Sequence, residues 1–149
     1  MTDQPVTAPI DIMLIEDDPS DIYLTREAFA DYKLRNRLIV FSNGRHALDY
    51  LHGRGPYPGG PLPDLILLDL NLPGLDGRDL LAEFAADPLL SVIPVVILTG
   101  SHAEADILRA RRMQVADFVV KPVDFARLVD VVKRIEGLAF TVVRVPSAA

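Results

Sequence analysis

The sequence contains no cysteine, and basic residues are fewer than acidic ones. Without cysteine the chain can form no disulfide, thiolate zinc site, iron–sulfur cluster or cysteine nucleophile. The 15 lysines and arginines stand against 21 aspartates and glutamates, and the net charge of −6 leaves no overall positive field to hold nucleic acid. No window reaches the ~18 apolar residues of a membrane span, and the N-terminus is neither basic nor strongly apolar. We therefore expect a cytoplasmic protein that binds no nucleic acid and no membrane.

Length and composition favour a single domain. The chain has 149 residues, within the ~100 to 200 residues that one domain usually takes. Half of the residues are apolar and 24% are charged, which suffices for one sizeable core and is too hydrophobic for a disordered chain. We expect one domain over 1–149, with a folded core at about 10–136 and a C-terminal extension at 137–149.

Short apolar runs alternate with segments of helical periodicity along the whole core. The apolar runs are short enough for strands buried on both faces, and each is followed by a predicted helix. This order indicates an α/β protein whose parallel sheet has helices on both sides. A segment rich in glycine and proline, 53–63, is predicted to be an irregular surface loop. The predicted strands are 10–15, 37–42, 64–70, 94–101 and 116–122, and the predicted helices are 21–34, 43–51, 77–87, 103–113 and 124–135.

Polar side chains stand where four of the predicted strands end. In a parallel sheet these carboxyl ends meet at one edge, and ligands bind just outside it. The candidate site residues are therefore those that follow the apolar runs: Glu16, Asp17, Asp18, Asp69, Asn71, Thr99 and Lys121.

The carboxylates among these residues predict a site for a divalent cation. If the first and third strands are neighbours, at least three carboxylates converge, and like charges so close either raise one another's pKa or demand a cation. Oxygen ligands without histidine or cysteine favour a hard ion, and a small open set with room for water favours Mg²⁺ over Ca²⁺. Asp17 and Asp69 are predicted to hold the metal directly. The backbone carbonyl of Asn71 is the third predicted protein ligand, and Glu16 is expected to act through water.

A carboxylate beside Mg²⁺, together with a hydroxyl and a lysine, makes a site for phosphoryl transfer, because such reactions depend on positioning and on charge neutralisation. Asp69 is the predicted nucleophile, which attacks phosphorus to form an acyl phosphate. Lys121 is expected to pair with one phosphoryl oxygen, and Thr99 to donate its hydroxyl to another.

Four segments, LIEDDP, LILLDLNLPGLDG, VVILTGS and FVVKP, resemble the four signatures of response-regulator receiver domains and occur in the same order. The spacings agree as well, with 30 residues from Asp69 to Thr99 and 22 from Thr99 to Lys121. The resemblance covers roughly 10–135. It implies a flavodoxin-like fold with five parallel strands in the order 2-1-3-4-5, a cis Lys121–Pro122 bond, and phosphate that arrives from a histidine kinase.

The resemblance also implies how phosphate becomes a signal. Phe118 lies three positions before Lys121, where receivers place an aromatic switch residue that rotates when Thr99 moves toward the phosphoryl group. The face expected to change is that of the fourth helix, fifth strand and fifth helix, which carries Arg109, Arg111, Arg112 and Asp117.

Two features depart from the common receiver pattern. Glu16 stands where many members have aspartate, which keeps the charge but lengthens the reach to the metal. The Gly/Pro loop lengthens the stretch before Asp69 and, together with the tail IEGLAFTVVRVP, is similar to the small stand-alone regulators that partner bacterial and cyanobacterial phytochromes. A segment of that tail, 140–145, is apolar on both faces if extended, so we expect it to be covered, by the body of the chain or by a second copy. Of the two, we predict the second copy, in a homodimer.

Two other functions fit parts of the sequence. A Mg²⁺-dependent phosphatase with an aspartyl nucleophile would place an acid/base aspartate two residues after Asp69, and that position is Asn71. A receiver-like scaffold that binds a partner regardless of phosphate would have a broken site, and none of the expected residues is absent. The leading prediction is a response regulator that catalyses its own phosphorylation and, more slowly, its dephosphorylation.

Overall fold

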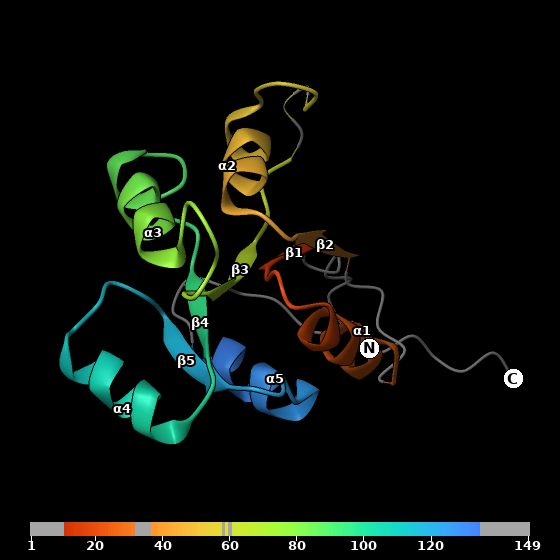
Figure 1. The fold of residues 1–149 in the computed structure, drawn as a ribbon, viewed down its shortest axis with the longest axis vertical. Coiled ribbons are helices and arrows are strands. Elements are labelled where there is room, and N and C mark those ends of the chain that lie inside the picture. Colours follow the sequence, from red (N-terminus) through yellow and green to blue (C-terminus); the bar gives the residue numbers. More distant parts are fainter. Residues whose placement is uncertain (1–10, 32–36, 58, 60, 135–149) are drawn as a thin grey trace, which may run out of the picture.

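The computed structural model describes residues 11–31, 37–57, 59 and 61–134. Strands and helices alternate throughout, as the sequence predicts (Figure 1). The order along the chain is β1 (Asp11–Ile15), α1 (Pro19–Asp31), β2 (Arg37–Phe41), α2 (Gly44–His52), β3 (Leu65–Asp69), α3 (Gly77–Ala86), β4 (Val95–Thr99), α4 (His102–Ala110), β5 (Asp117–Val120) and α5 (Phe125–Lys133).

The five strands form one parallel sheet in the order β2-β1-β3-β4-β5, which confirms the predicted doubly wound topology. β1 and β3 are direct neighbours, with Ile15 opposite Leu68. The carboxyl ends of β1, β3 and β4 therefore lie side by side, as the proposed convergence of carboxylates requires. The Lys121–Pro122 peptide bond is cis, as the resemblance implied.

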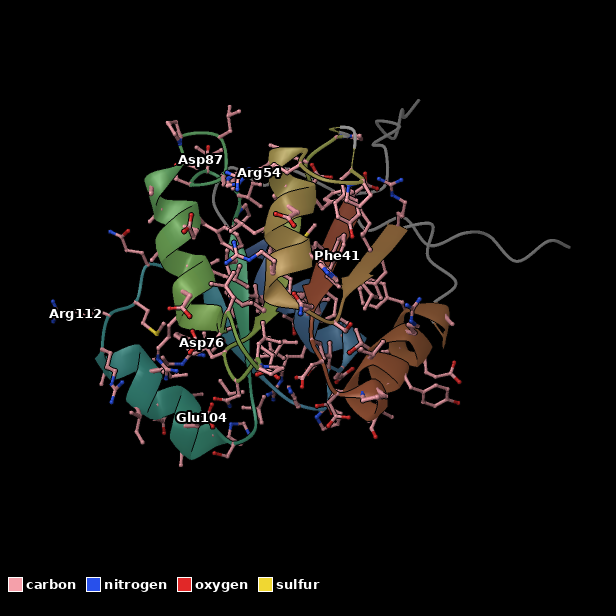
Figure 2. All side chains as sticks on the ribbon, turned by 45° about the horizontal axis from the view of Figure 1, so that its top comes forward. Phe41, Arg54, Asp76, Asp87, Glu104 and Arg112 are labelled. Carbon is pink, nitrogen blue, oxygen red and sulfur yellow. The ribbon has the colours of Figure 1, made fainter. Side chains whose placement is uncertain are left out.

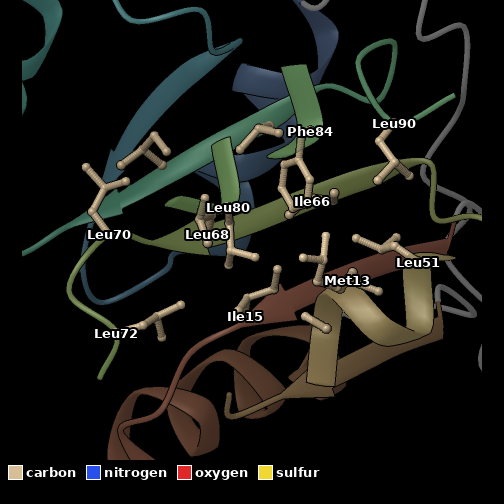
Figure 3. Packing of buried hydrophobic residues seen from close by; sticks show 14 of the residues in the cluster. Met13, Ile15, Leu51, Ile66, Leu68, Leu70, Leu72, Leu80, Phe84 and Leu90 are labelled. Atoms are coloured by element: carbon tan, nitrogen blue, oxygen red, sulfur yellow. The ribbon is translucent and has the colours of Figure 1, made fainter. Parts of the chain in front are cut away.

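Alternate residues of each strand pack into two separate cores because successive side chains point to opposite faces of a sheet. On one face, Met13, Ile66 and Ile97 pack beneath α2, α3 and α4. Figure 3 shows part of this core, where Leu80 and Phe84 of α3 and Leu51 of α2 meet the strands. On the other face, α1 and α5 cover Ile12, Leu14, Leu65, Leu67, Val96, Leu98 and Val119. Burial on both faces explains why the strands are continuous apolar runs.

Two predicted helix boundaries were wrong. α1 begins at Pro19 rather than near Asp21, since proline suits the first helical turn and the carboxylate of Asp18 accepts a hydrogen bond from the Ser20 amide at 2.8 Å. α4 ends at Ala110 rather than Met113. Arg112 has a positive φ of 51°, a conformation incompatible with a continuing helix, and the chain turns there toward β5.

The described part of the Gly/Pro loop contains no strand and no helix, as predicted, and it begins directly after α2 ends at His52. Its Tyr57 ring stacks edge-on against Phe41 and Tyr50, with ring centroids 5.7 and 5.6 Å away, so this loop residue packs locally. The extension 137–149, with its predicted role in dimer formation, lies outside the described residues. Within the described ranges, no helix is long and apolar enough to cross a membrane.

The helices run opposite to the strands, so the helix N-termini face the same edge as the strand ends. Figure 2 shows Asp76 and Glu104, at the starts of α3 and α4, at one end of the molecule, while Arg54 and Asp87, just past the ends of α2 and α3, lie at the other. The polar residues that end the strands are thus surrounded by helix starts, where backbone amides and positive dipole ends favour anions.

Candidate functional site

Asp69 is the last residue of β3, at the centre of the sheet, and its side chain is buried. One carboxylate oxygen, Oδ1, accepts a hydrogen bond of 2.9 Å from the backbone amide of Asn71. The start of α3 packs closely behind this strand end: a Cβ on Gly77 would lie 2.8 Å from the carbonyl oxygen of Asp69 and 2.5 Å from the Cα of Leu70. Glycine is therefore required there for α3 to approach the strand that carries Asp69.

Three carboxylates meet at this edge. Glu16 and Asp17 follow β1, and one oxygen from each lies within 4.8 Å of the others and of an oxygen of Asp69. Glu16 is buried, and its Oε1 has no hydrogen-bond partner. Three carboxylates so close together, with oxygen ligands alone, suit a hard divalent cation. Three of the residues predicted from the sequence to bind Mg²⁺, Glu16, Asp17 and Asp69, thus form a cluster of a kind that fits such an ion.

Lys121 brings a positive charge into the same cluster. Its Nζ donates hydrogen bonds to Asp69 Oδ2 at 3.0 Å and to Asp21 Oδ2 at 2.9 Å. It also lies 2.7 Å from Glu16 Oε1 and forms an ion pair with it, although the angle at this contact does not meet the criteria for a hydrogen bond. The ammonium group therefore contacts three carboxylates from β1, α1 and β3.

These contacts shift the pKa values in the cluster. Burial raises the pKa of the Glu16 carboxyl to about 7, against the smaller opposing effect of Lys121. Burial also acts to raise the pKa of Asp69, but hydrogen bonding with Glu16, Asn71 and Lys121 outweighs it and holds that pKa below its usual value. The pKa of Lys121 is raised, because the carboxylates around it outweigh the effect of its burial. At neutral pH the Asp69 carboxylate is therefore ionised and the Lys121 side chain is charged.

Thr99 is the last residue of β4 and is buried. Its hydroxyl donates to the carbonyl oxygen of Ser101 at 3.2 Å. The hydroxyl that the sequence assigns to a phosphoryl oxygen is therefore bonded to the backbone in this structure.

Phe118 in β5 is buried in the core beneath α4. The Arg109 guanidinium lies 5.1 Å from the centre of its ring, and also pairs with Asp117 at 3.0 Å. Arg134, which follows α5, lies 3.4 Å from the other oxygen of Asp117. A cation–π contact and two ion pairs thus connect α4, β5 and the end of α5 around the predicted switch residue.

Three of these arrangements differ from what the sequence predicted. It did not select Asp21, although an acidic residue in the first turn of a helix that follows the acidic strand end faces the same edge. It placed Asp18 with the carboxylates at that edge, whereas the Asp18 side chain bonds the Ser20 amide at the start of α1. Arg109 was grouped with the exposed arginines Arg111 and Arg112, and only the tertiary structure distinguishes it.

The fold and site define an α/β protein with an acidic cluster and a lysine at the carboxyl edge of a parallel sheet. The chain belongs to the response regulator receiver domain family, which matches residues 12–133. The membership inferred from the four sequence motifs is thereby confirmed.

Several relatives are regulators associated with phytochromes. The chain is 38% identical to the response regulator Rcp1 of Synechocystis sp. over 137 residues, 92% of this chain and 93% of Rcp1. The solved structure of the Mn²⁺-bound form of Rcp1 has a TM-score of 0.68, with 37% identity over 93% of this chain and all of that one. The bacteriophytochrome response regulator AtBRR has a TM-score of 0.83 and is 36% identical over 93% of this chain and 99% of its own. The phosphorylated cyanobacterial phytochrome response regulator RcpA has a TM-score of 0.69 and is 40% identical, covering 85% and 90% of the two chains.

Proposed function

We propose that this chain is a response regulator that accepts a phosphoryl group on Asp69 from a histidine kinase. One observation carries the proposal: the Asp69 carboxylate lies 3.0 Å from the Lys121 ammonium group and within 4.8 Å of two further carboxylates suited to Mg²⁺. An ionised nucleophile, a fixed cation and a metal-type ligand set are what phosphoryl transfer needs.

In this proposal an Asp69 oxygen attacks phosphorus, a new P–O bond forms, and the bond to the donor breaks, so that the donor leaves with its electron pair. Lys121 transfers its hydrogen bond from Asp69 to a phosphoryl oxygen. Thr99 donates its hydroxyl to another.

Asp17, Asp69 and the carbonyl of Asn71 would hold Mg²⁺, with Glu16 acting through water. The ion, when bound, neutralises charge on the phosphoryl oxygens.

The signal is proposed to leave through α4, β5 and α5. When Thr99 turns toward phosphate, Phe118 is expected to move, and the contacts of Arg109 with Phe118 and Asp117 then break or rearrange. Phosphate shifts this equilibrium only through its different interaction with the two arrangements, typically ~1 to 3 kcal/mol.

The partner is proposed to be a sensor kinase of the phytochrome type, supported by the names of the relatives AtBRR, a bacteriophytochrome response regulator, and RcpA, a cyanobacterial phytochrome response regulator. Such a kinase implies a cytoplasmic location.

We further propose a single receiver domain with a core at 10–136, whose extension at 137–149 contributes to a homodimer. Sedimentation equilibrium of the full chain measures its mass in solution, which should be twice the mass of one chain if the homodimer forms.

The experiment is to incubate the chain with acetyl phosphate and Mg²⁺ and to follow the aspartyl phosphate by mass spectrometry. We expect one phosphoryl group on Asp69, with acetate released, no product without Mg²⁺, and none in Asp69→Asn, which keeps the side-chain shape. Phosphorylation of Asp69→Asn at the wild-type level would refute the proposal. Rapid hydrolysis of assorted phosphomonoesters by the wild type would instead support the phosphatase alternative, which Asn71 disfavours by the lack of a proton donor.

A further inference from the structure

Lys121 is the last residue before a proline and lies beyond the end of β5, at the start of a loop. Its side chain is a flexible four-carbon stem that carries a point charge. Such a group stabilises a phosphoryl oxygen only if something fixes where the charge lies, because catalysis by electrostatic stabilisation depends on prior positioning.

Asp21 is the side chain in a position to do so. It lies in the first turn of α1, and its Oδ2 accepts a hydrogen bond of 2.9 Å from Lys121 Nζ across 100 residues of sequence. The helix start is itself fixed, since the Ile22 amide donates to the Asp18 carbonyl at 3.0 Å and the Thr25 hydroxyl donates to the Asp21 carbonyl at 2.9 Å. The carboxylate of Asp21, which accepts the hydrogen bond from Lys121, therefore belongs to an ordered first turn of α1.

The other two carboxylates around Lys121 have other tasks. Asp69 is the group that changes when phosphate arrives, and Glu16 belongs to the metal-type cluster with Asp17. Asp21 is not a member of that cluster among the described residues. Only two contacts of Lys121 have hydrogen-bond geometry, those to Asp69 and Asp21. When the first is transferred to a phosphoryl oxygen, the second still holds the ammonium group in place.

We propose that Asp21 is a positioning residue for phosphoryl transfer, which acts by holding the Lys121 ammonium group against the phosphoryl oxygens. The proposal rests on the proposed function of Asp69. It assigns Asp21 no contact with the phosphoryl group or the metal.

The test compares Asp21→Ala and Asp21→Asn with the wild type in phosphorylation by acetyl phosphate at saturating Mg²⁺, over a range of acetyl phosphate concentrations. We expect Asp21→Ala to lower the limiting rate about tenfold, with little change in the half-saturating concentration, because a misplaced charge weakens the transition state. Asp21→Asn keeps one oxygen acceptor and should lie between the two. Glu27→Gln, which removes an exposed carboxylate from the same helix, is the matched control and should react at the wild-type rate.

A second readout separates positioning from a merely structural role at the start of α1. The ¹H–¹⁵N signal of the Lys121 ammonium group, identified by its loss in Lys121→Met, reports directly on its hydrogen bonds. We expect the signal to be lost or broadened in Asp21→Ala and kept in Glu27→Gln. A wild-type limiting rate in Asp21→Ala, or a slower rate with an unchanged Lys121 signal, would overturn the proposal. If the wild type itself forms no aspartyl phosphate, the function of Asp69 fails, and the ammonium signal still tests the contact between Asp21 and Lys121.

Discussion

Replacing Glu16 with glutamine should make the metal-free protein more stable at alkaline pH and leave its stability unchanged near pH 4.5. Burial raises the pKa of Glu16 from 4.5 to about 7 on folding, so the folded chain binds a proton that the unfolded chain releases between these values. That contribution to stability is complete below pH 4.5 and is lost as pH rises through 7. Glutamine has the same shape and stays neutral, so Glu16→Gln does not undergo this loss.

The rise in the pKa of Glu16 from 4.5 to about 7 corresponds to a loss of about 3 kcal/mol in the free energy of unfolding at alkaline pH, since one pKa unit is worth about 1.4 kcal/mol. This is an upper limit, because the pKa of the neighbouring Asp69 moves in the opposite direction and the two carboxylates share the effect. The lowered pKa of Asp69 stabilises the fold above its unfolded value of 3.8, so that contribution is already present over the range tested.

The assay is urea unfolding followed by far-UV circular dichroism, without divalent cations, at pH 5, 6, 7 and 8. The free energy of unfolding of Glu16→Gln minus that of the wild type should increase with pH and level off above pH 7. Glu27→Gln is the control, because it shows how the loss of one exposed carboxylate changes the free energy of unfolding over the same pH range. A difference that stays constant from pH 5 to 8 would refute the assignment of a buried, proton-binding carboxyl to Glu16. Adding Mg²⁺ should stabilise the wild type more at pH 8 than at pH 5, because ligand carboxylates must be ionised to bind the ion.

Two further predictions concern the supports of the site. Gly77→Ala should lower the free energy of unfolding by about 1–3 kcal/mol, because its Cβ would lie under 3.0 Å from backbone atoms of Asp69 and Leu70. Thermal unfolding measures this loss. Gly100→Ala is the control, since a Cβ at Gly100 meets nothing within 4 Å. Arg109→Met should lower the free energy of unfolding by less than about 1 kcal/mol, since the contacts of Arg109 are partly exposed. It should nevertheless speed the ring flips of Phe118 measured by NMR, because the guanidinium no longer lies over the ring, whereas Arg111→Met should leave the flip rate unchanged. Equal flip rates in the two variants would argue against a restraint by Arg109.

The sequence by itself determined the fold class and most of the candidate site. Apolar runs that end in Asp17 and Asp69 identify strands buried on both faces, and since the carboxyl ends of parallel strands share one edge, the polar residues after them had to converge. The same reasoning located Lys121 and Thr99 without coordinates. Local signals also gave the helices, with errors at Pro19 and at Arg112, where capping and a left-handed turn override periodicity.

What only the tertiary structure decided is which side chains contact one another across elements. Periodicity places Asp21 in a helix and Lys121 after a strand, but the hydrogen bond between them depends on where the start of α1 lies relative to the end of β5 once both have packed. The same holds for Arg109, which the sequence cannot distinguish from its exposed neighbours Arg111 and Arg112, and for the buried state of Glu16 that raises its pKa. Secondary structure follows from patterns of near neighbours, whereas distances between side chains far apart in sequence, and the dielectric around them, exist only once the layers have packed.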